Sequence, residues 1–331
     1  MTRADAARAL RNALVAALPS AAHDNREIAR MRELMCDYPL RTGKLVRGRL
    51  ALLSAAAHGA DAADAMSGAV ALELFQSWVL IHDDIEDGSL VRRGRPALHR
   101  LVGMPVALNI GDALHVHMWA HLLRSGVPAA VTEEFLDMIS RTAEGQHLDL
   151  AWVEQGRLDV TEDEYLEMVR LKTAWYTVAS PLRLGAATAG RHPAGEFATA
   201  GLDLGAAFQI RDDVLNLTAD DASAGGYGKE RAGDLVEAKR TLIIAHFHAT
   251  AQTADRDRAA AILLGDASAA ELSWLLEALA ANGSIAYAQQ RAEELSGQAL
   301  ERLRTVLDAL PHQEPALEAL ALLESLASRT S

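Results

Sequence analysis

The feature that most constrains the fold is a densely apolar stretch, residues 64–82, that runs directly into a cluster of acidic residues. Its apolar side chains cover so much of a helical surface that such a helix must be buried nearly all round by other helices. The acidic run DDIED at 83–87 then falls at the carboxyl end of this helix, where the helix dipole is also negative. The segment therefore requires a helical core around it and positive charge at its end.

Helical patterning continues along nearly the whole chain. Alanine and leucine are abundant while aromatic residues make up only 5%, a composition that favours helices over strands. Besides 64–82, the periodic segments are 104–124, 128–153, 161–190, 194–219, 239–251 and 283–308. Glycine and proline fall between these segments, and neither an alternating run nor a linker interrupts them. We therefore expect one all-α domain over residues 1–331.

Net charge, cysteine content and the N-terminal pattern indicate which partners and which compartment suit the protein. The net charge of −13 argues against nucleic acid as a partner, because nucleic-acid-binding domains carry a basic footprint. Cys36 is the only cysteine, so no intrachain disulfide can form, which suits a reducing cytoplasm. Residues 1–20 have the pattern of an amphipathic helix rather than a signal peptide, and no stretch reaches the about 20 apolar residues of a membrane span. We expect a cytoplasmic protein without a membrane span.

The first acidic cluster has the spacing of a metal site. Asp83 and Asp87 are four residues apart and share a helix face, with Cβ atoms about 5–6 Å apart. Carboxylates this close repel one another unless a cation neutralises them, and Mg²⁺ accepts oxygen ligands from carboxylates, water and phosphate. Taken alone, the cluster is equally compatible with a solvated acidic helix end.

A second acidic cluster strengthens the metal hypothesis. Asp212, Asp213 and Asn216 follow the apolar part of segment 194–219 with the same spacing. Two such clusters on two apolar helices can face one another across a bundle core, where helical proteins build metal sites. The two clusters together predict several Mg²⁺ ions held between them and a bridging polyphosphate.

Basic residues are the third signal. Arginine suits bidentate recognition of phosphate, and lysine acts as a point charge. Each basic residue alone is more often a solvated surface residue, but around two acidic clusters the set predicts a diphosphate pocket. The residues concerned are Lys44, Arg47, Arg92, Arg93, Lys172, Lys229 and Lys239.

The combination resembles the trans-polyprenyl diphosphate synthases, a family of isoprenoid synthases with two aspartate-rich motifs. The resemblance runs from about Gly43 to Lys239 and rests mainly on LIHDDIED at 80–87, RRG at 92–94 and FQIRDD at 208–213. A single DDxxD occurs often by chance, whereas this pair with the RRG appended is specific. The resemblance implies a helical bundle of the isoprenoid synthase type with a central cavity, and further helices in the flanking residues.

The resemblance also implies roles for individual residues. The metal ligands would be Asp83, Asp84, Asp87, Asp212, Asp213 and Asn216, holding three Mg²⁺ ions. Arg92, Lys172 and Lys229 would contact an allylic diphosphate, and Lys239 would be a further substrate-binding residue. Isopentenyl diphosphate would bind to Lys44, Arg47, Gln76 and Arg93. Thr173 and Gln209 would line the reacting centre with Lys172, and Asp149 matches an acid that supports the site.

The chain departs from the family pattern at a few positions. The loop that usually reads GGKRxRP has Thr42 in place of its first glycine, Leu45 in place of the arginine after the lysine, and Gly48 in place of the proline. These changes make the isopentenyl side of the pocket less certain. Asn216 stands where the second motif often has aspartate, so metal binding at that corner would be weaker.

The implied reaction joins isopentenyl diphosphate to dimethylallyl, geranyl or farnesyl diphosphate. Trp78 and Val79 lie about one helical turn before Asp83, where they would close the cavity and limit product length. An aromatic residue followed by a small one resembles short-chain synthases, and synthases of twenty carbons (geranylgeranyl diphosphate) more than of fifteen (farnesyl diphosphate). The alternative is that Trp78 belongs only to core packing.

Other readings remain open. A class I terpene cyclase shares the fold type but needs no isopentenyl site, so Lys44, Arg47 and Arg93 speak against it. A regulatory subunit would keep the fold without the chemistry, against which the intact acidic residues argue. A P-loop enzyme and a ferritin-like oxygenase lack their motifs here. A homodimer is suggested by the family resemblance alone.

Overall fold

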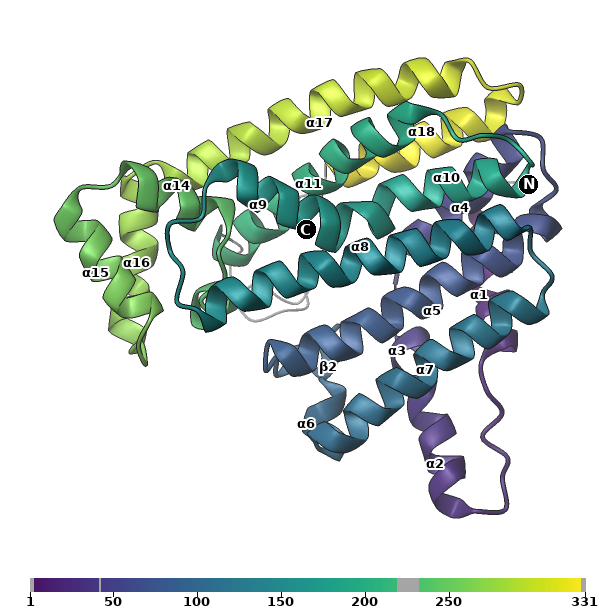
Figure 1. Ribbon diagram of the computed structural model, residues 1–331, viewed down its shortest axis with the longest axis horizontal. Coiled ribbons are helices and arrows are strands. Elements are labelled where there is room, and N and C mark those ends of the chain that lie inside the picture. Colours follow the sequence, from purple (N-terminus) through teal and green to yellow (C-terminus); the bar gives the residue numbers. More distant parts are fainter. Residues whose placement is uncertain (1–2, 42, 219–231, 329–331) are drawn as a thin grey trace.

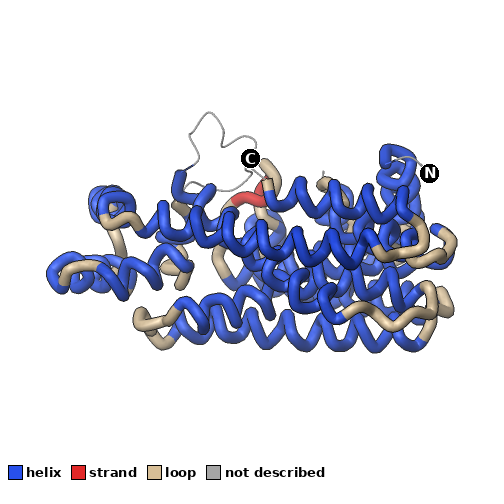
Figure 2. The backbone as a smooth tube through the Cα atoms, turned by 90° about the horizontal axis from the view of Figure 1, so that it is seen from above, coloured by secondary structure: helices blue, strands red, loops and turns tan. Residues whose placement is uncertain are grey.

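The computed structural model describes residues 3–41, 43–218 and 232–328. The described chain is almost entirely helical, and the long helices run roughly along the long axis of the molecule (Figure 1). Viewed from above, the same helices stack side by side in layers (Figure 2). The predicted all-α fold is therefore confirmed.

The first part of the chain builds one side of the bundle around a central helix. Its helices are α1 (Arg3–Ala17), α2 (Arg26–Met35), α3 (Asp37–Leu40), α4 (Val46–Ala57), α5 (Ala62–Glu86), α6 (Leu98–Val102) and α7 (Met104–Arg124). Segments 64–82 and 104–124 were thus correctly predicted as helices α5 and α7. Helix α4 falls in none of the predicted segments, because nearly all of its residues are buried and no polar face marks its period.

The second part supplies the opposite wall and the end of the bundle. Its helices are α8 (Ala129–Glu154), α9 (Glu162–Val169), α10 (Ser180–Thr188), α11 (Gly195–Thr218), α13 (Gly233–Val236), α14 (Leu242–Thr250), α15 (Thr253–Leu263), α16 (Ala269–Ala281), α17 (Ser284–Asp308) and α18 (Gln313–Ala327). The predicted segments 128–153, 194–219, 239–251 and 283–308 match α8, α11, α14 and α17 closely. Helices α15, α16 and α18 lie in the flanking residues, which the family resemblance alone predicted to be helical.

Helix α5 is surrounded as its composition requires. It packs against α4 and α7 along its length, with α1 and α10 completing its surroundings. Leu72, Leu74 and Phe75 have no exposed surface, and Ile81 near the acidic end is 1% exposed. Burying each such side chain contributes about 1.5–3 kcal/mol. The apolar packing therefore fixes where the acidic end of α5 lies.

A short hairpin follows the acidic end of α5, although no strand was predicted. Strands β1 (Val91–Arg92) and β2 (Arg95–Pro96) pair antiparallel around a two-residue turn. Both turn residues have positive φ, 53° at Arg93 and 72° at Gly94. This is the conformation of the type I′ turn that suits two-residue hairpins. The RRG motif therefore folds the chain back toward the carboxylates that precede it.

The predicted helix at 161–190 is continuous but changes its winding in the middle. A capping box of Thr161 and Glu164 starts α9, and a π-helical segment, η1 (Arg170–Ala179), joins α9 to α10. A methyl group on Gly145 of α8 would lie 2.1 Å from the Lys172 amide nitrogen, and one on Gly205 of α11 would lie 2.5 Å from the Ala174 Cα. Helices α8 and α11 thus pack so close to the backbone of η1 that only glycine fits at positions 145 and 205.

Among the described helices, none combines the length and the apolarity that crossing a membrane requires.

We predict that Gly145→Ala lowers the free energy of unfolding by about 1–3 kcal/mol, the usual cost of overpacking a dense interior. Gly297 on α17 is the matched control, because a methyl group there meets no atom within 4 Å. Gly297→Ala should be neutral or stabilise the protein by up to about 1 kcal/mol, since alanine favours a helix over glycine. Denaturant unfolding measures both variants, and equal effects would contradict the close approach of α8 to η1.

Candidate active site

A cavity of about 1440 Å³ runs through the bundle beside α5. Its walls come from α1, α4, α5, α8, η1, α11 and α18, and the hairpin covers part of one end. Most of the residues predicted from sequence line this cavity: Lys44, Arg47, Gln76, Trp78, Val79, Asp83, Arg92, Arg93, Lys172, Thr173, Gln209, Asp212 and Lys239. The fold therefore gathers residues that lie nearly two hundred positions apart in the sequence.

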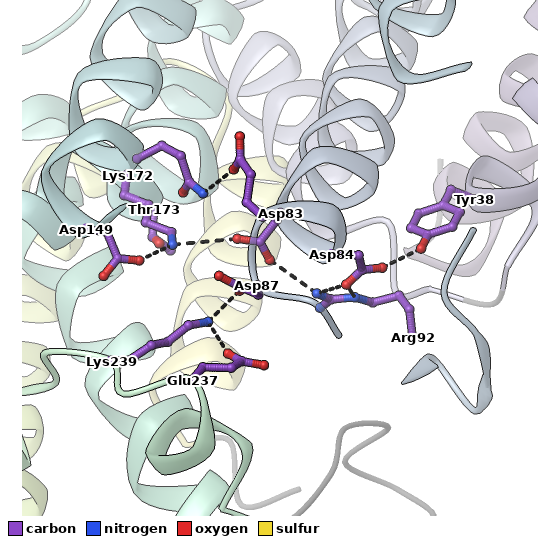
Figure 3. A network of polar contacts seen from close by, with 12 residues as sticks. Tyr38, Asp83, Asp84, Asp87, Arg92, Asp149, Lys172, Thr173, Glu237 and Lys239 are labelled. Atoms are coloured by element: carbon purple, nitrogen blue, oxygen red, sulfur yellow. Dashed lines mark hydrogen bonds and ion pairs between the residues drawn. The ribbon is translucent and has the colours of Figure 1, made fainter. Parts of the chain in front are cut away.

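Arg92 is fixed by the first aspartate cluster. Its Nε donates to Asp84 Oδ1 at 2.7 Å, and its Nη2 reaches Asp83 Oδ2 at 3.2 Å. Tyr38 from α3 donates its hydroxyl to the other oxygen of Asp84 (Figure 3). Burial opposes the charge on Arg92, but Asp84 and Asp83 outweigh it and raise its pKa above the ordinary value. Asp84 is fully buried, so the geometry assigns it to holding Arg92 rather than to facing the cavity.

Lys172 reaches the site from the π-helical segment. Its Nζ donates to Asp149 of α8 and lies 3.6 Å from Asp83 Oδ1. Burial works against its charge, yet Asp149 and Asp83 raise the pKa of Lys172 above its ordinary value. Thr173, the next residue, donates to the Gln209 amide oxygen at 3.2 Å. The Lys-Thr pair thus presents a fixed positive charge and a hydroxyl group on the same wall of the cavity.

Lys239 neutralises the last acid of the first cluster. Its Nζ donates to Asp87 Oδ2 at 2.6 Å and lies 2.9 Å from Glu237 Oε2 (Figure 3). Burial, followed by repulsion from Asp83, raises the pKa of Asp87, and Lys239 only partly offsets these effects. Because Lys172 and Lys239 also contact Asp149 and Glu237, carboxyl groups outnumber the cations that contact them at this end of α5.

The second cluster places its three members differently. Asp212 lines the cavity. Asp213 is buried one position further, where it accepts hydrogen bonds from the Tyr165 hydroxyl at 2.7 Å and the Gln209 amide at 2.8 Å. Burial and then Asp234 raise the pKa of Asp213 to about 7. Asn216 is 1% exposed, and its side-chain oxygen accepts the backbone N–H of Asp234 at 3.2 Å. Asp213 and Asn216 thus support the cavity wall from behind.

The donor set suits a hard divalent cation. Asp83 of α5 and Asp212 of α11 line one cavity, and Asp87 lies at the same end of α5. Within the described residues, no three acidic, histidine or cysteine side chains form a ready-made metal cage. Mg²⁺ rarely requires one, because it usually takes one or two carboxylates and completes its coordination with water and substrate phosphate. The arrangement therefore fits Mg²⁺ bound together with a phosphate-bearing ligand.

A second group of cations lines the cavity nearer α4. Arg47 donates to the Thr177 hydroxyl at 2.8 Å and lies over the Tyr176 ring. Lys44, Gln76 and Arg93 line the same region. The buried carboxyl of Glu73 is held at 2.8 Å by the Gly48 amide, and burial raises its pKa despite that hydrogen bond and the nearby arginines. The cavity is thus lined by two groups of cations, Arg92, Lys172 and Lys239 near the acidic end of α5 and Lys44, Arg47 and Arg93 near the start of α4.

An aromatic group forms part of the cavity wall at Trp78. The Trp78 ring stacks on His115 of α7 with centroids 3.9 Å apart and planes 2° apart. Trp119 donates its indole N–H to His115 Nε2 at 2.9 Å, so His115 is held in one orientation. Trp78 and Val79 both line the cavity, which agrees with their predicted position on its wall.

Some residues escaped the sequence prediction. Tyr38, Arg41 and Tyr165 each fix a predicted residue from a distant part of the chain; Arg41, for example, donates to the Arg92 carbonyl at 2.9 Å. No local motif marks them. Tyr176 and Thr177 could have been predicted from the sequence. Tyr176 lies four residues after Lys172, and Thr177 lies four residues after Thr173, so each shares a helix face with a predicted site residue. Lys229 lies outside the described residues.

Comparison with known proteins agrees with this geometry. A family model described as polyprenyl synthetase matches residues 29–279. A geranylfarnesyl diphosphate synthase of Natronomonas pharaonis is 39% identical over 272 residues, covering 81% of this chain and 74% of the relative. A short chain isoprenyl diphosphate synthase of Methanothermobacter thermautotrophicus is 37% identical, covering 85% of this chain and 84% of the relative.

Solved structures show the same fold. A geranylgeranyl pyrophosphate synthetase from Pyrococcus horikoshii superimposes with a TM-score of 0.83 at 31% identity, covering 98% of each chain. A geranylgeranyl pyrophosphate synthase from Corynebacterium glutamicum, solved with isoprenyl diphosphate and magnesium, has a TM-score of 0.86 at 26% identity and covers 99% of this chain and 100% of that one. Together with the family match, these likenesses show that the chain belongs to the polyprenyl synthetase family.

Proposed function

We propose that this protein is a short-chain trans-prenyltransferase that joins isopentenyl diphosphate to an allylic diphosphate and releases a longer prenyl diphosphate. The observation that carries the proposal is one cavity lined by two groups of cations, one at the acidic end of α5 and one at the start of α4. Two diphosphates bound at these two groups would point their hydrocarbon parts toward the same enclosed space. A terpene cyclase, which takes one diphosphate, has no use for the second group of cations.

The group at the acidic end of α5 suits the allylic diphosphate. Lys172 and Lys239 are held in their charged forms by neighbouring carboxylates, which raise both pKa values despite burial. Arg92 is held in place by Asp84 and Asp83. Cations that are fixed before the reaction stabilise charge as it builds on a leaving diphosphate, without the cost of reorganising solvent.

Asp83, Asp87 and Asp212 would hold Mg²⁺ at this end, together with oxygens of the allylic diphosphate. When bound, Mg²⁺ supplies Lewis-acid stabilisation of the departing diphosphate. The support for this assignment is the surplus of carboxyl groups over cations at the end of α5 and the magnesium named for the Corynebacterium glutamicum structure. Asp84, Asp213 and Asn216 would contribute indirectly, through the residues that they hold.

The reaction breaks the allylic C–O bond, and its electron pair leaves with the diphosphate. The double bond of isopentenyl diphosphate then forms the new C–C bond at the allylic cation, and the adjacent proton passes to the released diphosphate, so no side chain acts as the base. Phe75, Leu150 and Tyr176 line the cavity, and such apolar walls exclude water that would quench the cation.

We propose geranylgeranyl diphosphate as the main product. Trp78 closes the cavity, and its stacking on His115 fixes the position of that barrier. Several relatives, among them a protein of Sulfolobus acidocaldarius, are named geranylgeranyl diphosphate synthases. Farnesyl diphosphate is the product expected if the barrier stops the chain one unit earlier.

We further propose that the protein acts as a homodimer through α7. Leu108, Val116 and Leu123 lie on one broad face of this helix and are 43%, 68% and 61% exposed. Exposed apolar rows of this kind mark interaction surfaces more often than free surface. The family resemblance supports a second copy of the chain as the partner.

The first prediction tests the reaction. The purified protein, given isopentenyl diphosphate with dimethylallyl, geranyl or farnesyl diphosphate, should release extended products only when Mg²⁺ is present. Asp83→Asn should lower kcat at least about 10²-fold, the scale for removing one charge-stabilising group. Asp137→Asn removes an exposed acid of α8, 63% accessible, and is the control. Release of hydrocarbon from one allylic substrate would indicate a cyclase, and a complete lack of turnover a regulatory subunit.

The second prediction concerns product length. Trp78→Ala should shift the main product to at least one five-carbon unit longer, because the barrier is removed. His115→Ala should shift it in the same direction but less, because Trp78 stays and loses its support. Trp274→Ala, which removes an indole from α16 far from the cavity lining, is the control. Chromatography of the dephosphorylated products gives the answer, and unchanged lengths for Trp78→Ala would refute the barrier.

The third prediction concerns assembly. Light scattering after size exclusion should give wild-type protein twice the chain mass, and Val116→Glu should give a single chain, because the change places charge in the apolar face of α7. Leu317→Glu alters a comparably exposed residue on α18, 55% accessible, and should leave the dimer intact. A monomeric wild-type protein would rule out the homodimer.

A further inference from the structure

The group of cations beside α4 is built differently from what its loop sequence suggests. Leu45, which replaces an arginine of the family pattern, is 8% exposed and belongs to the apolar core around α5. It also has a left-handed backbone with φ 48°, so its side chain is directed by a strained turn. The loop therefore provides Lys44 but no second cation next to it.

Helix α1 brings another cation to the same place. Arg11 lines the cavity, and its Nη2 donates to the Gly43 carbonyl at 3.0 Å. A methyl group on Gly43 would lie 3.1 Å from Arg93 Nη1, so the Arg93 guanidinium lies directly against the same loop residue. Arg11 and Arg93 thus approach one glycine of the loop, one from α1 and one from the hairpin.

The position of α1 is fixed by packing rather than by Arg11 itself. Leu10 and Leu14 of α1 are 0% and 2% exposed. A methyl group on Gly48 of α4 would lie 2.7 Å from Leu10 Cδ2, so the glycine that replaces a proline lets α1 approach α4 closely. The same residue donates its N–H to the buried Glu73, a bond that proline could not make. Gly48 thus accommodates both α1 and the buried acid.

We propose that Arg11 binds the diphosphate of isopentenyl diphosphate, supplying from the N-terminal helix the positive charge that Leu45 does not provide. This inference rests on the proposed function. A guanidinium carries five N–H donors, of which the Gly43 carbonyl takes one, so the rest can meet phosphate oxygens. Arg8, one turn earlier, lines the same cavity. Arg47 and Arg93 line the cavity together with Arg11.

The test measures binding and turnover separately. Calorimetry with isopentenyl diphosphate alone gives Kd without catalysis, and the condensation assay gives KM for each substrate and kcat. Arg11→Gln should raise Kd and KM for isopentenyl diphosphate about tenfold or more, the scale of one charge-assisted hydrogen bond. The KM for the allylic diphosphate and kcat should stay within twofold, and Arg11→Lys should recover part of the loss. Arg11 is exposed, so the melting temperature should not change.

Arg30→Gln is the matched control, because it removes the same charge from α2, where Arg30 is 59% exposed and pairs with Glu33 outside the cavity. A Kd for isopentenyl diphosphate within twofold of wild type in Arg11→Gln would overturn the inference, as would equal weakening in Arg30→Gln. Failure of the wild-type protein to bind isopentenyl diphosphate would overturn it as well. Binding without condensation in the wild-type protein would count against the proposed function alone.

Discussion

The structure depends on the neutralisation of the acidic end of α5. Asp83, Asp84 and Asp87 lie at the end of a helix packed between α4 and α7, and their side chains are 14%, 0% and 7% exposed. Arg92, Lys172 and Lys239 supply the opposing charge from the hairpin, the π-helical segment and the chain before α14. Charges taken out of water must be paired, since an unpaired one costs several kcal/mol. The segments that carry these cations are therefore held against α5 by electrostatics as well as by apolar packing.

The same requirement connects the fold to the chemistry. Under the proposed function, the carboxyl groups at the end of α5 would hold a divalent cation with its phosphate ligand, and apolar residues of the same helix line the cavity. The Trp78–His115 stack belongs to this wall. One helix thus carries both the proposed metal ligands and Trp78, the proposed limit on product length, about one turn apart.

Much of this was predictable from sequence, and the exceptions share a cause. The periodic apolar segments predicted the main helices, because helical periodicity follows from local spacing, whereas most of the cavity-lining residues were predicted only by the family resemblance. Spacing does not tell which acid of an adjacent pair faces the cavity. Asp84 and Asp213 face away because Tyr38 and Tyr165, far off in sequence, donate hydrogen bonds to them. Helix α4 lacked a period because it is buried on nearly every side, and the hairpin depends on the backbone of Arg93 and Gly94.

The π-helical segment changes the helix face on which residues lie, so that equal spacing in sequence means different faces before and after it. A π turn takes up more chain than an α turn, so α10 is out of phase with α9, although the two form one rod. A helical wheel drawn from Glu162 through Thr188 would therefore assign the wrong face to everything after Ala179. The π-helical segment therefore rotates α10 relative to α9, and Lys172 and Thr173 of the site lie within this segment.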